Sequence, residues 1–587
     1  MTDFTFFNAK GEVDLNSLVG IRVHGGYTRK YQQKSLNVYF REEYGKKNWK
    51  YELIPGTVNH DGTAKTNKYK NFVLRNGGND TNMTKLTDVF LQSLVRDRNI
   101  STQGYQPCVV YLNGEYWGVY NIMEKYSDNW LEEEFGVNKD NVVLIKDGEV
   151  DEGQDEDYAL FEEFTALGNL DMTQEENYQK FLDAVDLTSY LDYYATEIII
   201  GNHDWGLIKN NQFWRSRTKT DTKYEDGKWR WLLHDTEFSM GLWDSDPDLI
   251  HNMITSEDEE KKDPVFAAVS KNTKFRQALA STILELLDNN FNYDKKFSSY
   301  DALVELYKPQ IMESLLRFGS DWGKGAEESC FNNRVEGFKR TWSTKETDVL
   351  GILKTNFGYT STGRSQVTFT CENGADSLTV NRVVKTLIDG KNVSTYYKKD
   401  PIEVTAPDVE GCQFVGWEVT GGTSENNSAK TTNVTLTDST ATVKAKYIKE
   451  DDGKKPGEKE PVEQGTNTGK GTTTETGNDN GNSGKVSGVT VSVKKPGKAK
   501  LISVKAGKKS MKVKIKKQAS ADGYQIVYAA NKKFTKAKRS KITNKATITI
   551  KKLKSKKTYY VKVRAYKKNG GKKVYGSYSK LKKVKTK

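Results

Sequence analysis

The stretch Gly201-Asn-His-Asp-Trp-Gly-Leu-Ile-Lys-Asn-Asn-Gln-Phe-Trp-Arg215 places acids and amides directly after an apolar segment, Glu197-Ile-Ile-Ile200. A second apolar run also ends in acids, as Trp231-Leu-Leu-His-Asp-Thr-Glu237. Charged groups are costly at the ends of buried elements, because leaving water penalises charge. Four residues at these ends are therefore either caps and turn formers or the ligands of a metal: Asp204, Asn210, Asn211 and Asp235.

The composition divides the chain into parts of opposite charge. A length of 587 residues exceeds what one hydrophobic core supports and predicts roughly three or four domains. Residues 494–587 carry 34 Lys and Arg against one acid, Asp522, whereas the rest of the chain carries 57 basic and 77 acidic residues. The overall charge of +13 therefore describes neither part.

The beginning of the chain is expected to be rich in strands. Alternating apolar and polar residues predict half-buried strands at 20–26 and 35–40. Asn113-Gly114 is typical of the two-residue turn of a hairpin. Between these elements, residues 84–98 have the apolar spacing of a helix.

Helices are expected from about residue 127 to 355, where apolar residues recur with the 3.6-residue period. Two predicted strands, 212–216 and 228–233, interrupt this pattern. We therefore expect one α+β domain, 1–360, in which a β-rich lobe is followed by a helical lobe.

Two all-β modules are expected after this domain. Residues 366–448 are rich in Thr, Val, Ser and Gly and read as strands. Residues 449–492 cannot bury a core and are expected to form a flexible linker. Short alternating strands in 493–587 predict a small basic β-sandwich.

The polar residues of the α+β domain fit phosphoryl transfer. That chemistry needs a carboxylate near the acceptor hydroxyl, ligands for Mg²⁺ and a cation on the phosphates. Protein kinases order these groups as a base Asp, then a metal-binding Asn, a hairpin and a second metal-binding Asp. This sequence has the same order, in Asp204, Asn210 or Asn211, and Asp235. Spacing alone still favours the caps-and-turns interpretation, because short motifs give false positives.

A phosphate-binding cation can also be suggested from the pattern. Lys34, on an expected strand, is the candidate, and Asp88 on the following helix could orient it as a helix acid does in kinases. No GxGxxG precedes Lys34, only His24-Gly-Gly-Tyr-Thr28, and Asp235 is followed by Thr-Glu rather than Phe-Gly.

Four ordered motifs resemble the spore coat protein H (CotH) kinase family, over about residues 15–355. Besides the two acidic motifs, they are Gly20-Ile-Arg-Val-His-Gly-Gly-Tyr-Thr-Arg-Lys-Tyr-Gln-Gln-Lys-Ser-Leu36 and Tyr111-Leu-Asn-Gly-Glu-Tyr-Trp-Gly-Val-Tyr-Asn-Ile-Met-Glu-Lys125. The resemblance implies a two-lobed atypical protein-kinase-like fold that binds ATP with Mg²⁺ and phosphorylates serines of partner proteins. By the same resemblance Asp204 is the catalytic acid/base position and Asp235 the metal ligand, with Asn210 or Asn211 completing the site. Lys34 would contact phosphate and Glu124 the nucleotide.

The β modules resemble parts of surface proteins. Residues 366–448 are similar to bacterial surface β-repeats, and 496–587 resemble fibronectin type III-like modules of secreted proteins from Gram-positive bacteria. We therefore expect a secreted or cell-surface protein whose signal peptide is not present in this chain, and no run of the ~20 apolar residues that would span a membrane is found. The basic module is expected to bind an anionic cell wall, with nucleic acid less favoured because no RNA-binding aromatic motif accompanies the lysines.

A second function from another class is consistent with the same sequence. The chain could be a cell-surface adhesin or scaffold whose kinase-like domain is inactive, with binding carried by the β modules. The β modules and the missing glycine-rich motif favour it. The four cysteines, Cys108, Cys330, Cys371 and Cys412, form no CxxC pair and are expected to be unpaired thiols, although Cys371 and Cys412 share one β-rich segment.

Overall fold

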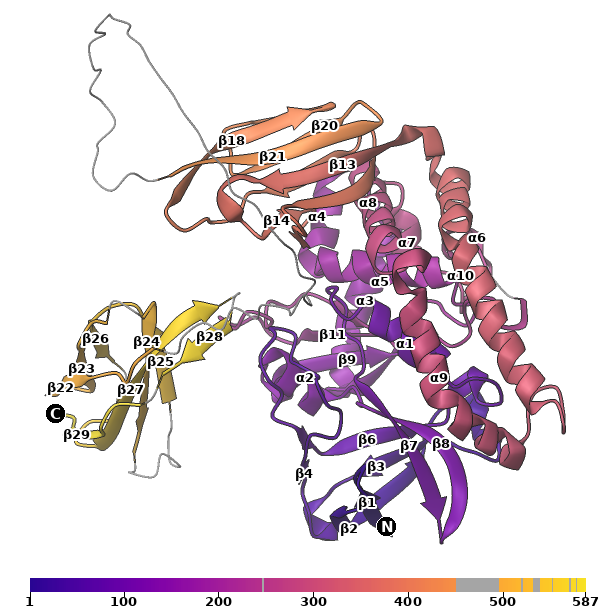
Figure 1. Ribbon diagram of the computed structural model, residues 1–587, viewed down its shortest axis with the longest axis horizontal. Helices are drawn as coiled ribbons and strands as arrows, with labels where there is room; N and C mark the ends of the chain where they lie inside the picture. Colours follow the sequence, from indigo (N-terminus) through magenta and orange to yellow (C-terminus); the bar gives the residue numbers. More distant parts are fainter. Residues whose placement is uncertain are drawn as a thin grey trace, which may run out of the picture. The chain divides into compact units, whose positions relative to one another are not determined.

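The computed structural model describes residues 1–244, 247–449, 496–518, 521–530, 539–551, 553–569, 572–576 and 578–587. The expected linker, 449–492, lies outside these residues apart from its first position. The chain forms two compact units, Met1–Gly457 and Glu458–Lys587 (Figure 1). Both sheets and helices are present in the first unit, which confirms the α+β class.

The first unit begins with an antiparallel sheet in the order β1-β2-β3-β6-β8-β7. Asn113 and Gly114 both have positive φ (50° and 82°) in the turn between β7 and β8, as a two-residue hairpin turn requires. Helix α1 (Thr87–Leu94) follows β6 and is shorter than the predicted 84–98. The strands are β1 (Thr2–Phe7), β2 (Val13–Val23), β3 (Leu36–Tyr39), β6 (Asn71–Arg75), β7 (Tyr105–Leu112) and β8 (Glu115–Met123).

A second antiparallel sheet, in the order β10-β9-β11-β12, lies among the helices. Its two strands from the hairpin, β11 (Gln212–Ser216) and β12 (Arg230–Leu232), lie close to the predicted ranges. The other two are β9 (Val142–Lys146) and β10 (Glu149–Glu152). This sheet matters for the site because the loops before β11 and after β12 carry the acidic motifs.

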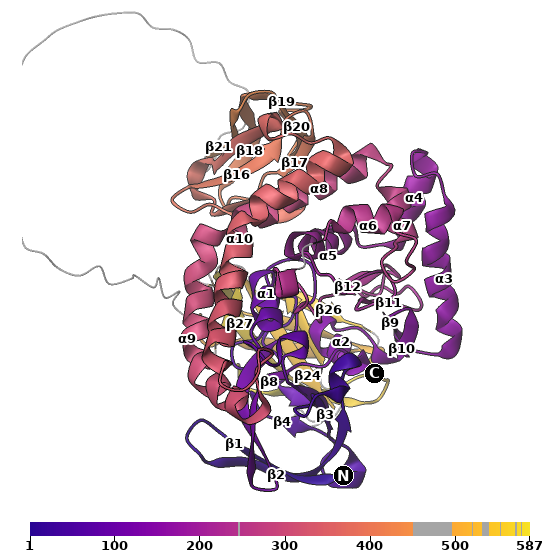
Figure 2. The ribbon, with the colours of Figure 1, turned by 90° about the vertical axis from the view of Figure 1, so that its right-hand side faces the viewer.

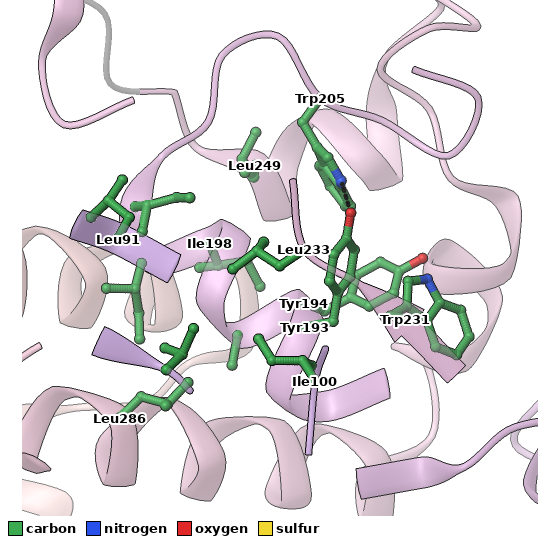
Figure 3. Close-up of a cluster of buried hydrophobic side chains, with 14 of the residues drawn as sticks. Leu91, Ile100, Tyr193, Tyr194, Ile198, Trp205, Trp231, Leu233, Leu249 and Leu286 are labelled. Atoms are coloured by element: carbon green, nitrogen blue, oxygen red, sulfur yellow. Dashed lines mark hydrogen bonds between the residues drawn. The ribbon is translucent and has the colours of Figure 1, made fainter. Parts of the chain in front are cut away.

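The helices bury the largest core of the chain around α5 (Leu187–Ile200). Twelve of its fourteen residues are buried. Aromatic side chains from α5, from the loop that follows α5 and from β12 pack together here (Figure 3). Helices α9 and α10 run side by side along one flank (Figures 1 and 2). The remaining helices are α2 (Asp128–Phe135), α3 (Tyr158–Ala166), α4 (Glu175–Ala184), α6 (Leu249–Thr255), α7 (Pro264–Val269), α8 (Thr273–Asn289), α9 (Tyr293–Phe318) and α10 (Glu327–Phe357).

The first β module belongs to the same compact unit as the helices. It contains one sheet in the order β16-β13-β21-β18 and another in the order β15-β14-β17-β20-β19. It packs on α8 through Glu285, which accepts a hydrogen bond from the Tyr396 hydroxyl at 2.7 Å and lies 3.4 Å from the amino group of Lys385. The strands are β13 (Arg364–Cys371), β14 (Ser377–Val380), β15 (Val383–Thr386), β16 (Lys391–Tyr397), β17 (Pro401–Thr405), β18 (Cys412–Thr420), β19 (Gly422–Ser424), β20 (Thr431–Leu436) and β21 (Thr440–Lys449).

The second unit contains the basic β module. One sheet has the order β22-β23-β26; the other has the order β25-β24-β27-β28, with β29 also paired to β27. Along β23 the apolar residues are buried and the lysines exposed, so the charge lies on the outer face. The strands are β22 (Leu501–Gly507), β23 (Ser510–Ile515), β24 (Gly523–Ala529), β25 (Arg539–Thr543), β26 (Thr547–Ile550), β27 (Thr558–Asn569), β28 (Lys572–Tyr575) and β29 (Lys582–Lys585).

All four cysteines lie among the described residues and are free thiols, as expected. Over the part of the chain that the structure describes, no helix is long and apolar enough to cross a membrane.

Candidate active site

One part of the site is a loop that starts where helix α5 ends. Gly201 closes α5 in the left-handed conformation (φ 63°, ψ 52°), and its amide donates to the Glu197 carbonyl at 3.0 Å. The chain then leaves the core, and Asp204 emerges with 32% of its side chain exposed. A tight turn follows, because the amides of Gly206 and Lys209 each donate to the other's carbonyl, at 3.0 and 3.3 Å. The turn brings the next residues back beside Asp204.

The two asparagines after this turn occupy different places. Nδ2 of Asn210 donates to the backbone carbonyl of Asp204 at 2.7 Å and to the Oδ2 atom of Asp204 at 3.2 Å. Oδ1 of Asn210 takes no part in these two hydrogen bonds. Asn211 is fully buried; its backbone pairs with Asp147, and both polar atoms of its side chain lack a partner. The structure therefore places Asn210 beside Asp204 and Asn211 beneath the surface.

The other part of the site follows strand β12. Asp235 has a left-handed backbone (φ 57°), which aspartate tolerates better than most residues. Its Oδ1 accepts a hydrogen bond from an Nη2 of Arg75 at 2.7 Å, and the same nitrogen donates to the fully buried carboxylate of Glu237. Nε of Arg75 also lies 3.5 Å from Oδ2 of Asp88 on α1. One guanidinium thus joins the end of β6 to three carboxylates.

The two acids after β12 differ in their protonation. Burial opposes ionisation of Asp235, but the neighbouring Arg75 outweighs it and holds the pKa of Asp235 well below its usual range. Burial raises the pKa of Glu237 well above its usual range, against the opposing effect of Arg75. Arg75 thus favours the ionised form of Asp235, whereas burial favours the protonated form of Glu237.

A cavity of about 500 Å³ brings these two parts together. The loop after β2 borders it, with Gly25 in the left-handed region (φ 89°). Gly78 also borders it, and a Cβ at that position would lie 1.2 Å from Oε1 of Glu237, so a side chain is excluded there. The lining residues are Gly25, Gly26, Tyr27, Thr28, Arg75, Gly78, Asn79, Asp204, Lys209, Asn210, Asp235, Glu237, Phe238 and Trp243.

Four of the residues suggested by the sequence lie outside this lining: Asn211, described above, and Lys34, Asp88 and Glu124. The amino group of Lys34 donates to the Tyr31 carbonyl at 2.6 Å, and Arg75 takes the place beside Asp88 that the sequence analysis gave to Lys34. Asp88 also accepts from the amide and hydroxyl of Thr236, at 3.1 and 2.9 Å, so it anchors the segment that follows Asp235. The predicted Lys34–Asp88 pair is thus corrected to Arg75–Asp88.

Glu124 is the fourth of these residues. It directly follows β8, accepts from the Gly104 amide at 2.8 Å and forms an ion pair with Lys65. These contacts place its carboxylate at another cavity, of about 360 Å³, rather than beside Asp204 or Asp235. The backbone after β8 nevertheless continues to Lys125 and Tyr126, which line a small cavity described below.

Sequence reasoning missed Arg75, Lys209 and Glu237. Arg75 had a usable signal, since it ends an apolar strand, Asn71-Phe-Val-Leu-Arg75, that leads into the helix bearing Asp88. Glu237 lay inside a quoted motif, but its contact with Arg75 joins residues 162 positions apart. The position of Lys209 beside Asp204 depends on the tight turn between Gly206 and Lys209. Residue types alone do not predict that turn.

The family model described as CotH kinase protein matches residues 21–321 of the chain, which include every residue of the cavity. The chain belongs to the CotH kinase family. No curated protein matches it.

Solved structures similar to parts of this CotH kinase family chain include a fibronectin type III domain. One is a fibronectin type III domain derived from human KIAA0970 protein, with 15% identity, TM-score 0.13, and coverage of 15% of this chain and 72% of that one. Another is the FN1–FN3 region of chicken CNTN1, with 24% identity, TM-score 0.13, and coverage of 15% and 30%. A third, titled "Myokine structure", has 21% identity, TM-score 0.13, and coverage of 16% and 97%.

Membership of the CotH kinase family implies ATP and a divalent metal. The residues of the cavity fit a metal of the Mg²⁺ type, which prefers carboxylate and amide oxygens and keeps several waters. Asp235 and Oδ1 of Asn210 would hold it, and Glu237, whose buried Oε2 has no hydrogen-bond partner, lines the same cavity. Within the described residues no group of three or more His, Cys, Asp and Glu could hold a metal by itself.

A smaller cavity, of about 50 Å³, shares Arg75 with the large one. It lies at the end of β8 and is lined by residues of both sheets: His24, Val73, Arg75, Gln103, Met123, Lys125, Tyr126, Lys146, Asp151, Gln212 and His234. Burial lowers the pKa of His24 and of His234 to about 3, so both rings are neutral at pH 7. The small cavity thus combines two neutral imidazole rings with the charged side chains of Arg75, Lys125, Lys146 and Asp151.

Proposed function

We propose that the chain is an atypical protein kinase that transfers the γ-phosphoryl group of ATP to serines of partner proteins. In this proposal the strands that lead to Arg75 form one lobe and the helices that carry Asp204 and Asp235 form the other. A single observation carries the proposal: Arg75 links Asp88 to Asp235 at the wall of a cavity that Asp204 and Asn210 also line. This arrangement matches the cation, helix acid, base and metal ligands of kinases.

Each residue has a role that follows from its surroundings. Asp204 is partly exposed and would accept the proton of the serine hydroxyl. Asp235 stays ionised beside Arg75 and, with Asn210, would hold the divalent metal. Arg75 orients both Asp235 and Glu237 and reaches towards the phosphates. Bound Mg-ATP would supply the phosphoryl group and part of the charge neutralisation that its transfer requires.

The partners follow from the surface and from the module composition. We propose a protein substrate with an acceptor serine, and binding of the basic C-terminal module to an anionic wall polymer. On β23 the side chains of Lys512 and Lys514 point outward while Met511, Val513 and Ile515 are buried, which supports an electrostatic surface. Residence at the surface of a Gram-positive bacterium, or secretion from it, fits this role. Binding to anionic wall material should weaken steeply with added salt if charge drives it.

A thermal-shift and ADP-release experiment on the full chain tests the kinase function. Mg-ATP at 100 times its dissociation constant should stabilise the fold by about 2.7 kcal/mol, and EDTA should remove that shift. ADP release should rise when a serine-containing acceptor protein is added. That protein should become labelled when γ-labelled ATP is used. Absence of both binding and transfer would favour the alternative, an adhesin or scaffold with an inactive kinase-like domain.

A further inference from the structure

Lys209 is held against Asp204 by the shape of the loop. The paired backbone groups of Gly206 and Lys209 close a turn with two residues between them. The turn brings the amino group of Lys209 to 2.9 Å from Oδ1 of Asp204. The same amino group lies 2.6 Å from Oε2 of Glu260.

The segment around Glu260 fixes this turn from outside. A Cβ on Gly206 would lie 1.7 Å from the carbonyl oxygen of Glu260, so only glycine allows the two backbones to approach this closely. The amide of Lys261 bonds to the Asp258 carbonyl at 2.9 Å, which closes the segment on itself. Lys209 is therefore presented to the cavity by backbone contacts on both sides.

Among the residues that the structure describes, Lys209 and Arg75 are the two cations that line the large cavity. Arg75 contacts Asp88, Asp235 and Glu237, and only 12% of its side chain is exposed. The side chain of Lys209 is 37% exposed, and it contacts Asp204, the residue proposed to take the proton of the serine hydroxyl. Its long flexible stem and its three rotatable donors allow it to exchange one anionic partner for another without moving the backbone.

We propose that Lys209 is a further catalytic residue. Its amino group moves away from Asp204 and donates hydrogen bonds to the oxygens of the phosphoryl group while that group is transferred. In this step the serine oxygen forms a bond to the γ-phosphorus, and the bond from that phosphorus to the bridging oxygen breaks. ADP leaves with the electron pair of that bond, and the hydroxyl proton passes to Asp204. Lys209 donates hydrogen bonds throughout and keeps its own protons.

The exchange of partners has a second consequence for the same step. Lys209 contacts Oδ1 of Asp204 and Asn210 contacts Oδ2, so each carboxylate oxygen keeps one further acceptor site. When Lys209 turns to the phosphoryl group, Oδ1 loses a competing donor and can accept the hydrogen bond of the serine hydroxyl more strongly. An interaction made only as charge develops in transfer raises kcat rather than affinity for the nucleotide.

This inference rests on the proposed kinase function, and substitution of Lys209 in the full chain tests it. Lys209→Met should lower kcat for ADP release, measured with Mg-ATP and a serine-containing acceptor protein, by about 100-fold or more. KM for ATP and the Mg-ATP thermal shift should stay within about threefold of the parent. Lys209→Arg should restore at least about a tenth of the parental kcat, because it returns a positive donor.

Two control variants separate catalysis from structure. Lys262→Met removes a lysine from the neighbouring segment, where it lies 3.9 Å from Glu259, and should leave kcat unchanged. Glu260→Gln removes the other ion pair of Lys209 and leaves the positive charge of Lys209 in place. We therefore expect kcat to fall by no more than about threefold.

Three results would overturn the assignment. Lys209→Met could transfer phosphate like an active parent, could raise KM with kcat unchanged, or could lose no more activity than Glu260→Gln. A parent chain without any transfer would overturn the kinase function together with this role, whereas an active parent with an active Lys209→Met variant would overturn the role alone.

Discussion

The two aspartates of the cavity have equally exposed side chains, 32% each, but different neighbours. Asp204 lies on a turn between a lysine and an asparagine. Asp235 follows a buried strand, has a left-handed backbone and is held in the ionised form by Arg75. Environment assigns different tasks to chemically identical groups. The first is placed to take a proton from an incoming hydroxyl and the second to hold a cation.

Replacement of Arg75 should have the largest effect on this contrast. Arg75→Met would leave Asp88, Asp235 and Glu237 without their shared cation, and breaking a buried ion pair in this way typically costs about 3–5 kcal/mol. Urea unfolding should show this loss, while Arg22→Met on the exposed face of β2 should change stability by less than about 0.5 kcal/mol. An Arg75→Met variant as stable as the parent would mean that the three acids do not depend on one cation.

The two adjacent asparagines provide a sharper comparison. Asn210→Ala should weaken Mg-ATP binding by about tenfold or more, since a charge-linked ligand contact is worth roughly 1.5–3 kcal/mol. Asn211→Ala should leave binding within about threefold, because the Asn211 side chain does not line the cavity. Calorimetric titration of both variants with Mg-ATP measures the difference. A larger loss for Asn211→Ala would exchange the two assignments.

Glu197 provides a third carboxylate, which is fully buried in α5 below the loop of Asp204. Burial raises the pKa of Glu197 to about 8. The unfolded chain releases this proton near pH 4.5 whereas the folded chain keeps it up to about pH 8, so this group lowers the stability as pH rises between the two values. Its contribution amounts to at most about 1.4 kcal/mol per pH unit.

Glu197→Gln should remove this slope. The stability difference between variant and parent should therefore grow in favour of the variant from pH 5 to pH 8, measured by urea unfolding at each pH. A difference that is constant with pH would show that Glu197 is ionised in the folded chain.

The smallest effect is expected for Lys34, which the sequence favoured as the phosphate-binding cation. Its amino group donates a hydrogen bond to the backbone carbonyl of Tyr31, and Lys34 does not line the cavity. Lys34→Ala should therefore change KM for ATP and kcat by less than about threefold. A tenfold rise in KM would restore Lys34 as a phosphate contact and remove that role from Arg75.

Sequence patterns predicted elements whose signals are local. A periodicity or a turn signal is present in the strand hairpin at Asn113-Gly114, in the strands near 212–216 and 228–233, and in the largely buried α5. The order of Asp204, the two asparagines and Asp235 was equally visible. These features depend on residues that are neighbours in the chain.

Contacts between distant residues were not accessible in the same way. Arg75 meets Asp235 across 160 positions, and its local signal, the end of an apolar strand, does not show which acids it contacts. The packing of the first β module on α8 depends on Glu285, which lies 111 positions from Tyr396 and is an ordinary acid in a helical pattern. Only the folded chain shows which charged side chains are buried together.

The most direct test compares Asp204→Asn with Asp235→Asn in one experiment. Mg-ATP affinity and phosphoryl transfer to serine are measured for both variants and the parent. The account predicts that Asp204→Asn keeps its affinity within about threefold and loses about 10²–10⁴ in transfer rate, while Asp235→Asn loses at least about tenfold in affinity. Transfer at the parental rate by both variants, or loss of affinity in Asp204→Asn alone, would contradict it.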